Sequence, residues 1–199
     1  MKTFTAKTEE EALSLAAQEL NVATSEITYK VVSTKKTLFS KKVEISCYTI
    51  EMVQTFIEEY IQRILTSMEF EVETVSYMQN NRIYCNINSD HNSIIIGKGG
   101  VILRAINTIV RHAVMNTFGK HFEISVDING YKEERYKKVS AMAKRFAKQV
   151  IRTKCEIKLD PMPSDERKVM HQILQEMDNI STKSYGEGKN RHMVISYKG

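Results

Sequence analysis

The isoleucine run at residues 94–96 leads directly into the turn Gly97-Lys98-Gly99-Gly100, and this junction constrains the fold more than any other part of the chain. Three branched apolar side chains require a core on which to pack. Three glycines in four residues permit backbone conformations and close approaches that a Cβ atom obstructs. A helical pattern starts directly after the turn, so the free N–H groups of a helix start and Lys98 face the same point. The sequence therefore predicts a core-anchored loop directed at a negative group, such as a nucleic-acid backbone.

The segments around this turn follow the order helix, strand, strand, helix, strand. Hydrophobic periodicity places them at residues 51–67, 71–78, 82–87, 100–117 and 122–128. On the second helix, five residues are expected to form the core face: Ile102, Ile106, Ile109, Val110 and Ala113. This order, with a glycine loop ahead of the last helix, is typical of a type II KH domain, whose G-x-x-G loop clamps the backbone of a few nucleotides.

Several polar residues near the turn are candidates for contact with the nucleic acid. Lys98 can reach a phosphate as a point charge. Arg104, Asn107 and Arg111 are spaced three and four apart and form a polar stripe, which is either a solvated helix face or a further set of contacts. The candidate binding residues of this segment are Gly97, Lys98, Gly99, Gly100, Arg104 and Arg111.

Residues 1–50 are expected to form a smaller unit with a helix that ends near Leu20 and strands at 27–32 and 43–50. A basic loop lies between the two strands. Its candidate partner-binding residues are Lys35, Lys36, Leu38 and Phe39. Either the two apolar residues fold back onto the sheet, or they remain exposed within a ring of charge and form a docking site.

The positive charge of the chain is concentrated at its C-terminal end. The whole chain has a net charge of +5, whereas residues 129–199 carry 16 basic and 9 acidic side chains, a net charge of +7. A helix over residues 131–154 carries a basic stripe of Lys137, Lys144, Lys148 and Arg152. Such a stripe either only favours solubility or contacts phosphates, and its place in the most basic segment favours phosphate contact.

A second C-terminal helix follows Pro163 and carries Arg167 and His171, which are four residues apart and share one face. Arginine offers a fixed fork of donors to phosphate, and histidine offers a donor and a flat ring for stacking. His171 taken alone would more often be a structural histidine. Arg191 lies in the strand pair that follows, and completes the candidate binding residues.

The composition argues against several other classes of protein. No window approaches the roughly 18 continuous apolar residues of a membrane span, and the N-terminus lacks the apolar region of a secretory signal. Cys47, Cys85 and Cys155 lie far apart, and the five histidines lack metal-binding spacing. We therefore expect a cytoplasmic protein that is not an enzyme and has no metal, cofactor or small-molecule substrate.

These features together resemble the Jag family, also called SpoIIIJ-associated proteins, over essentially the whole chain. The segment from Pro161 to His171 is similar to the R-x-x-x-H signature of that family's last domain, and residues 184–191 are similar to its hairpin. The resemblance implies an α+β fold of three small domains. These are a Jag N-terminal domain (1–50, β-α-β-β), a type II KH domain (51–128, α-β-β-α-β) and an R-x-x-x-H domain (129–199, α-β-α-β-β).

The resemblance also implies a function, which is binding of RNA in the bacterial cytoplasm in the control of cell elongation and division. The implied partners are single-stranded RNA and a small single-domain KH protein, and KH surfaces that pair would give a homodimer. Peripheral contact with a membrane-protein insertase would make the chain an adaptor that docks through its N-terminal domain. A third alternative is single-stranded DNA binding through the R-x-x-x-H domain. We predict a non-catalytic protein that prefers single-stranded RNA.

Overall fold

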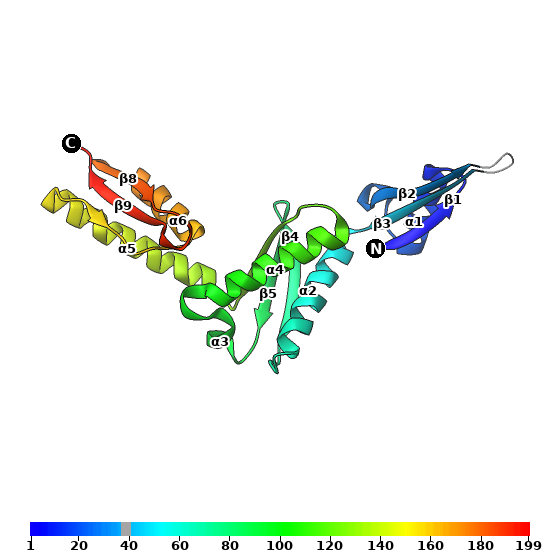
Figure 1. Cartoon of the computed structure of the whole chain (residues 1–199), viewed down its shortest axis with the longest axis horizontal. Coiled ribbons are helices and arrows are strands. Elements are labelled where there is room, and N and C mark those ends of the chain that lie inside the picture. Colours follow the sequence, from blue (N-terminus) through cyan, green and yellow to red (C-terminus); the bar gives the residue numbers. More distant parts are fainter. Residues whose placement is uncertain (37–40) are drawn as a thin grey trace. The chain divides into compact units, whose positions relative to one another are not determined.

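The computed structural model describes residues 1–36 and 41–199, which form two compact units, Met1–Asn129 and Gly130–Gly199. The described residues contain three separate three-stranded sheets, two in the first unit and one in the second (Figure 1). The boundary predicted at residue 128 lies beside the division between the units. The boundary predicted at residue 50 falls between two sheets of one unit, and the three-domain division stays a prediction.

The first sheet consists of β1 (Lys2–Ala6), β2 (Thr28–Lys36) and β3 (Lys41–Tyr48) in the antiparallel order β1-β3-β2. Between β1 and β2 lie α1 (Glu9–Leu20) and the short 3-10 helix η1 (Thr24–Glu26). Helix α1 packs on β1 and β3 through buried Ala12 and Ala16. The predicted β-α-β-β order is confirmed.

The second sheet and its helices form the central segment, residues 50–128. It contains α2 (Ile50–Thr66), β4 (Glu73–Gln79), β5 (Arg82–Asn88), α3 (Asn92–Ile96), the 3-10 turn η2 (Lys98–Gly100), α4 (Val101–Phe118) and β6 (Glu123–Ile128). The sheet has the order β4-β5-β6, with β6 parallel to β5 because α4 forms the crossover between them. Helices α2 and α4 contact each other, with α2 against β4 and α4 against β6 (Figure 1). The order is the one predicted for a type II KH domain, with the short helix α3 added.

The core face of α4 differs from the prediction. Its buried residues are Leu103, Ile106, Val110, Val114 and Phe118. Ile102 and Ile109, both expected in the core, are 40% and 47% exposed. Apolar residues surround most of this helix, so the sequence contains two overlapping stripes, and only packing against α2 and β6 selects one of them.

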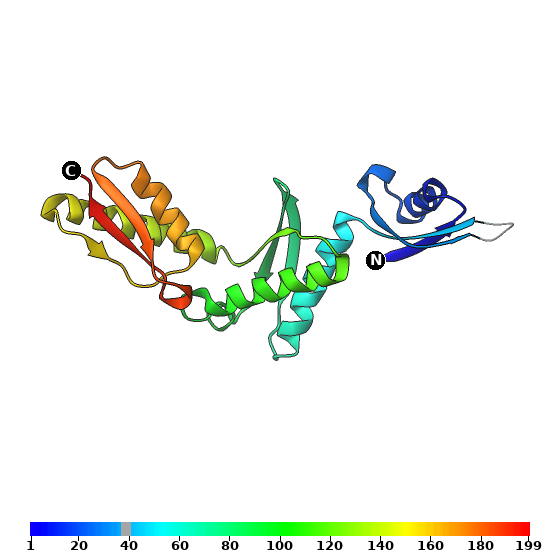
Figure 2. The same cartoon turned by 45° about the horizontal axis from the view of Figure 1, so that its top comes forward.

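The C-terminal unit contains α5 (Tyr131–Thr153), β7 (Ile157–Lys158), α6 (Ser164–Gln175), β8 (Ile180–Tyr185), the 3-10 turn η3 (Gly188–Asn190) and β9 (His192–Tyr197). The sheet is antiparallel in the order β7-β9-β8. Figure 2 shows the β8–β9 hairpin lying along α5 and α6. The predicted α-β-α-β-β order is confirmed.

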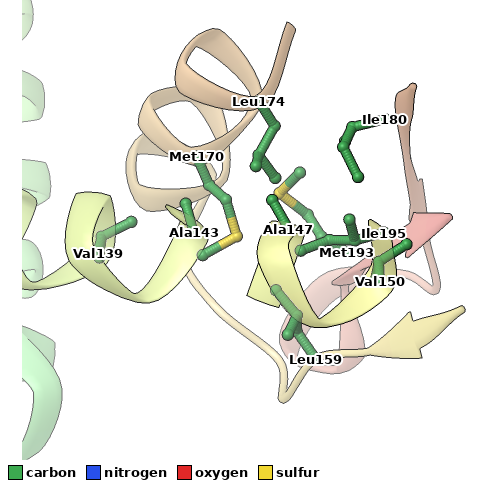
Figure 3. Packing of buried hydrophobic residues seen from close by; sticks show 10 residues of the cluster. All are labelled: Val139, Ala143, Ala147, Val150, Leu159, Met170, Leu174, Ile180, Met193 and Ile195. Atoms are coloured by element: carbon green, nitrogen blue, oxygen red, sulfur yellow. The ribbon is translucent and has the colours of Figure 1, made fainter. Parts of the chain in front are cut away.

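One hydrophobic cluster joins both helices of the C-terminal unit to the same face of its sheet (Figure 3). Met170 and Leu174 of α6 lie beside Ala143 and Ala147 of α5, with Ile195 of β9 beneath them. The alanines let the two helices approach closely, while the larger α6 side chains fill the space above the sheet. The opposite face of this sheet carries neither α5 nor α6.

The stretch Asn92–Phe118 is long and apolar enough to cross a membrane by length and composition alone. It is divided into α3 and α4 by the turn at Gly97 to Gly100, where the three glycines have positive φ angles. Five residues of α4 are buried in the protein core. The core helix of a folded domain therefore accounts for its apolar character.

Candidate nucleic-acid interface

The glycine turn at the start of α4 has the geometry that its sequence predicts. Gly97, Gly99 and Gly100 have φ angles of 70°, 60° and 75°, a region that L side chains rarely adopt. A Cβ atom on Gly97 would lie 2.7 Å from Cγ1 of Ile102, so this position also lacks room for a side chain. Lys98 and Gly99 are exposed, and no atom lies within 4 Å of a Cβ built on Gly99. The tip of the turn is therefore open to a ligand.

The isoleucines before the turn divide between anchoring and exposure. Ile95 is buried in the core, whereas Ile94 is largely exposed and Ile96 is half-buried. Val101, directly after the turn, is also exposed. Exposed apolar side chains on both sides of the glycines provide a surface for bases next to a backbone-binding loop.

Arg104 holds the turn from inside the chain. Its Nη1 donates a hydrogen bond of 2.6 Å to the carbonyl oxygen of Gly99. Arg104 therefore stabilises the turn and also places a positive charge beside it. The sequence indicated a positive charge at this position but not the intramolecular bond.

Asn107 and Arg111, the rest of the predicted polar stripe, satisfy the open edge of β6. The backbone N–H of Val126 donates to Oδ1 of Asn107 at 3.0 Å. Nε and Nη2 of Arg111 donate to the carbonyl oxygen of Ile124 at 3.1 and 2.6 Å. Because β5 is the one described strand that pairs with β6, these side chains replace a missing strand and tie α4 to the sheet. Nucleic-acid contact by Arg111 stays a prediction, and in this structure its guanidinium is bound to the sheet.

In the C-terminal unit, the structure brings the predicted pair Arg167 and His171 against strand β8. Arg167 donates through Nη1 to Oγ of Ser184 at 3.3 Å and through Nε to the carbonyl oxygen of Met162 at 3.3 Å. His171 Nδ1 lies 2.6 Å from Oγ1 of Thr182. The hydroxyls of Thr182 and Ser184 thus hold both side chains along the edge strand β8. Each side chain keeps further nitrogen atoms for a ligand.

The first turn of α6 is fixed by contacts that the sequence did not reveal. Arg135 of α5 forms a bidentate pair with Glu166, with Nε–Oε1 and Nη2–Oε2 distances of 2.9 Å. Glu166 is only 2% exposed, and its hydrogen bonds raise the pKa of Arg135 above the usual value. The hydroxyl of Tyr136 donates to Oδ2 of Asp165 at 3.0 Å. These bonds hold the residues directly before Arg167, so they orient the Arg167–His171 pair. A buried acidic residue beside the pair was the one available sequence signal.

The basic stripe of α5 lies on the side opposite to its buried residues. Lys137, Lys144, Lys148 and Arg152 are all exposed, as predicted for a solvent-facing stripe. Lys137 forms an ion pair of 2.6 Å with Glu133, whose pKa is lowered by that hydrogen bond. Arg191 is also exposed, at the end of the hairpin turn between β8 and β9. Phosphate contact by these residues stays a prediction.

The predicted docking loop is described only in part. Lys35 and Lys36 end strand β2 and are exposed. Leu38 and Phe39 lie outside the described residues, so the structure gives no account of them.

The comparisons with known proteins agree with this division of the chain. The family model of the Jag N-terminus matches residues 4–47, and the model of the R-x-x-x-H domain matches residues 137–197. The second match contains both Arg167 and His171. The chain is thus a protein that joins a Jag N-terminal domain to an R-x-x-x-H domain.

Three relatives extend the match beyond these two domains. The chain is 31% identical over 204 residues to RNA-binding protein KhpB of Clostridium symbiosum, which covers 100% of this chain and 92% of the relative. It is 35% identical over 141 residues to KhpB of Bacillus subtilis (70% of this chain and 68% of the relative). It is 29% identical to KhpB of Streptococcus pneumoniae serotype 2 over 77% of this chain, and spans 47% of that relative. The chain belongs to the KhpB family, which is the Jag family predicted from the sequence.

Proposed function

We propose that this chain is a non-catalytic protein that binds single-stranded RNA at two places. The glycine turn Gly97-Lys98-Gly99-Gly100 clamps the backbone of a few nucleotides, and the surface around Arg167 and His171 binds a further stretch. Relatives that are named RNA-binding proteins support the RNA assignment. In a cell, control of elongation and division is the role that the family resemblance implies, and we propose it on that basis.

The observation that carries the proposal is the exposed glycine turn at the N-terminus of α4. Three positive φ angles remove side-chain bulk from the tip, and Lys98 is exposed there. The first turn of α4 adds free N–H groups and the positive end of the helix dipole. Bare backbone, a lysine and a helix N-terminus together suit a phosphodiester chain better than a small neutral ligand.

The charge distribution gives the two places different tasks. Residues 51–128 carry a net charge of −3, whereas residues 129–199 carry +7. A glycine turn on a negatively charged segment binds RNA weakly by itself. The C-terminal unit supplies long-range attraction, which depends strongly on salt because bound phosphates release counterions.

The test is binding of the full chain to a pool of single-stranded RNA and to matched single-stranded DNA over a salt series. One variant combines Lys98→Asp with Gly99→Asp. Its matched control combines Gly119→Asp with Lys120→Asp, since Gly119 also has a positive φ angle and open space around it. The control makes the same change in charge at the other end of α4, where no binding is expected.

A second variant, Arg167→Ala with His171→Ala, addresses the C-terminal site. Its control is Lys168→Ala with Gln172→Ala, two exposed residues of the same helix with the same spacing. We expect both site variants to lose affinity and both controls to bind as the unaltered chain does. Equal binding by all the proteins at physiological salt contradicts the proposal. Equal affinity for RNA and DNA replaces RNA with single-stranded nucleic acid in general.

The second candidate function is an adaptor that docks on a membrane-protein insertase through the N-terminal unit. Edge strand β2 favours it, because Val31 and Val32 are exposed close to Lys35 and Lys36. Replacing Leu38 and Phe39 with serine is expected to abolish co-purification with the insertase and to leave RNA affinity unchanged. Retained co-purification argues against this docking loop.

Self-association or a small KH protein as a partner is proposed for the central segment. Ile102 and Ile109 are seven residues apart on α4, share one face of the helix, and are exposed. Ile109→Glu is expected to lower the mass that light scattering measures for the chain in solution or mixed with the partner. An unchanged mass argues against pairing through this face of α4.

A further inference from the structure

The sheet of the C-terminal unit has one face that neither α5 nor α6 covers. Side chains alternate across a strand, and the hydrophobic cluster with the helices includes Ile180, Met193 and Ile195. Their neighbours in the strands therefore lie on the outer face. In register, these are Lys183 opposite Val194, Tyr185 opposite His192, Ser181 opposite Ser196, and Lys158 of β7 opposite Val194.

Two rings form the last rung of the β8–β9 ladder on this outer face. Tyr185 pairs with His192 in register, and their ring centroids are 6.5 Å apart. Tyr185 is 50% exposed, although a tyrosine usually buries most of its ring. His192 Nδ1 lies 2.9 Å from the carbonyl oxygen of Asn190, so the turn fixes the orientation of its ring.

The turn that connects the two rings is closely packed. A Cβ atom on Gly186, which has a φ angle of 78°, would lie 2.6 Å from the carbonyl oxygen of Asn190. The glycine lets the chain turn back directly after Tyr185, which brings Tyr185 and His192 side by side. The ring pair is therefore held by the backbone before any ligand arrives, and little ordering cost remains for binding.

The charge of the outer face is of one sign. Its paired residues include Lys158 and Lys183 and contain no acidic side chain. By contrast, the outer face of the central sheet, where Tyr77 stacks on Tyr84, also carries Glu123 and Asp127 on β6. Exposed rings beside lysines suit single-stranded nucleic acid, since bases stack on rings and phosphates pair with ammonium groups.

We propose that this outer face, centred on Tyr185 and His192, is a base-stacking platform for single-stranded RNA. The inference rests on the proposed RNA-binding function and extends it from the backbone to the bases. Ser184, to which Arg167 donates a hydrogen bond, directly precedes Tyr185. One edge strand, β8, thus has the Arg167–His171 pair along its helix-facing side and the platform on its outer side. An RNA strand that crosses this edge contacts both, with phosphates at the pair and bases on the rings.

The test compares two ligands with the full chain, a single-stranded RNA of about 12 nucleotides and an abasic ribose-phosphate chain of the same length. Tyr185→Ser removes the ring, and Tyr185→Phe keeps it. Tyr77→Ser is the matched control because it removes a similarly exposed tyrosine from the outer face of the other sheet. Arg167→Ala with His171→Ala reports on the proposed function independently of the platform.

We expect Tyr185→Ser to lower affinity for the base-bearing RNA about 5- to 150-fold, the range for loss of one stacked base. Affinity for the abasic chain and the salt slope should not change, because stacking releases no counterions. Tyr185→Phe and Tyr77→Ser should bind as the unaltered chain does.

Three results overturn the platform. Unchanged binding by Tyr185→Ser, with weaker binding by the Arg167 and His171 variant, refutes the platform and leaves the proposed function intact. An equal loss on both ligands, or an equal loss with Tyr77→Ser, shows that the ring acts on folding and not on a base. Absence of RNA binding by the unaltered chain refutes the proposed function and the platform together.

Discussion

Arginines on the same helix have different roles in this protein, and their hydrogen bonds distinguish them. Arg104 donates to the carbonyl oxygen of Gly99 within the glycine turn, and Arg111 donates to the carbonyl oxygen of Ile124 in β6. The sequence placed both in one polar stripe because their spacing is helical. The spacing does not reveal which carbonyl groups lie within reach, since these come from distant parts of the chain.

Replacement of Arg111 by methionine separates a structural role from a binding role. We expect the free energy of unfolding to fall by about 1 kcal/mol, because a backbone carbonyl at the sheet edge loses its donor. RNA affinity should stay within about twofold, a change of less than about 0.5 kcal/mol. Thermal unfolding and RNA titration measure the two quantities. A loss of affinity without a loss of stability would show that Arg111 contacts the RNA, as the polar stripe predicted.

The cysteines offer a second prediction at this scale. Cys85 is fully buried, and burial raises the pKa of its thiol from 9.0 to about 12, whereas Cys155 is exposed. Iodoacetamide reacts with thiolates, so we expect the folded chain at about pH 8 to be labelled at Cys155 and not at Cys85. Mass spectrometry of peptides after labelling and unfolding locates the adduct. Equal labelling of both cysteines would show that the central segment opens on the time scale of the reaction.

The same shift fixes a pH dependence of stability. Because the pKa of Cys85 is higher in the folded than in the unfolded chain, the unfolded chain releases this proton first as the pH rises. The contribution of Cys85 is therefore constant below about pH 9, and stability falls between about pH 9 and 12. Cys85→Ala is expected to remove this part of the fall in denaturant titrations. An identical fall in the variant would assign it to other groups.

At the scale of elements, the contact between α5 and α6 controls the candidate site of the C-terminal unit. Arg135 lies before the region that the R-x-x-x-H domain model matches, at residues 137–197, yet its guanidinium holds the buried carboxylate of Glu166. The next residue along α6 is Arg167. Packing of Met170 and Leu174 on α5 sets the depth of α6, and the ion pair sets its rotation at the end that carries the site.

Arg135→Met tests this clamp between the helices. We expect a loss of about 2 kcal/mol in the stability of the C-terminal unit, because Glu166 remains buried without its partner. The side chain of Arg135 is itself 37% exposed, which keeps the loss below that of a fully buried pair. Arg135→Met combined with Glu166→Met should recover part of the stability, since no unpaired charge remains. Failure of the double variant to recover would assign the loss to packing.

At the scale of the whole molecule, the two compact units differ in charge and therefore in their expected response to salt. We expect the fragment 1–129 to bind single-stranded RNA more weakly than the full chain and with a flatter salt dependence. The fragment 130–199 should retain most of the salt slope because it contains the net positive charge. Circular dichroism first establishes that each fragment is folded. A full salt slope in fragment 1–129 would contradict the division of tasks proposed for the units.

The sequence alone predicted the order of elements in every part of the chain, with α3 as the main addition. It also identified the glycine turn and the Arg167–His171 pair. These features are local: hydrophobic periodicity, glycines that need positive φ angles, and residues four apart on a helix all depend on near neighbours. Family resemblance added the identities of the N-terminal and C-terminal domains, which the matches to the Jag N-terminus and the R-x-x-x-H domain confirm.

Only the tertiary structure decided which of these residues are held and which are open. It placed Ile102 and Ile109 on the surface, tied Arg111 to β6, and joined Arg135 to Glu166 across two helices. It also set Tyr185 beside His192 on the uncovered face of a sheet. Each of these outcomes depends on the rotation of a helix or the register of a strand, and both are fixed by packing between segments far apart in the sequence. The sequence therefore determined the elements and their chemistry, and long-range packing decided which side chains are free to meet an RNA.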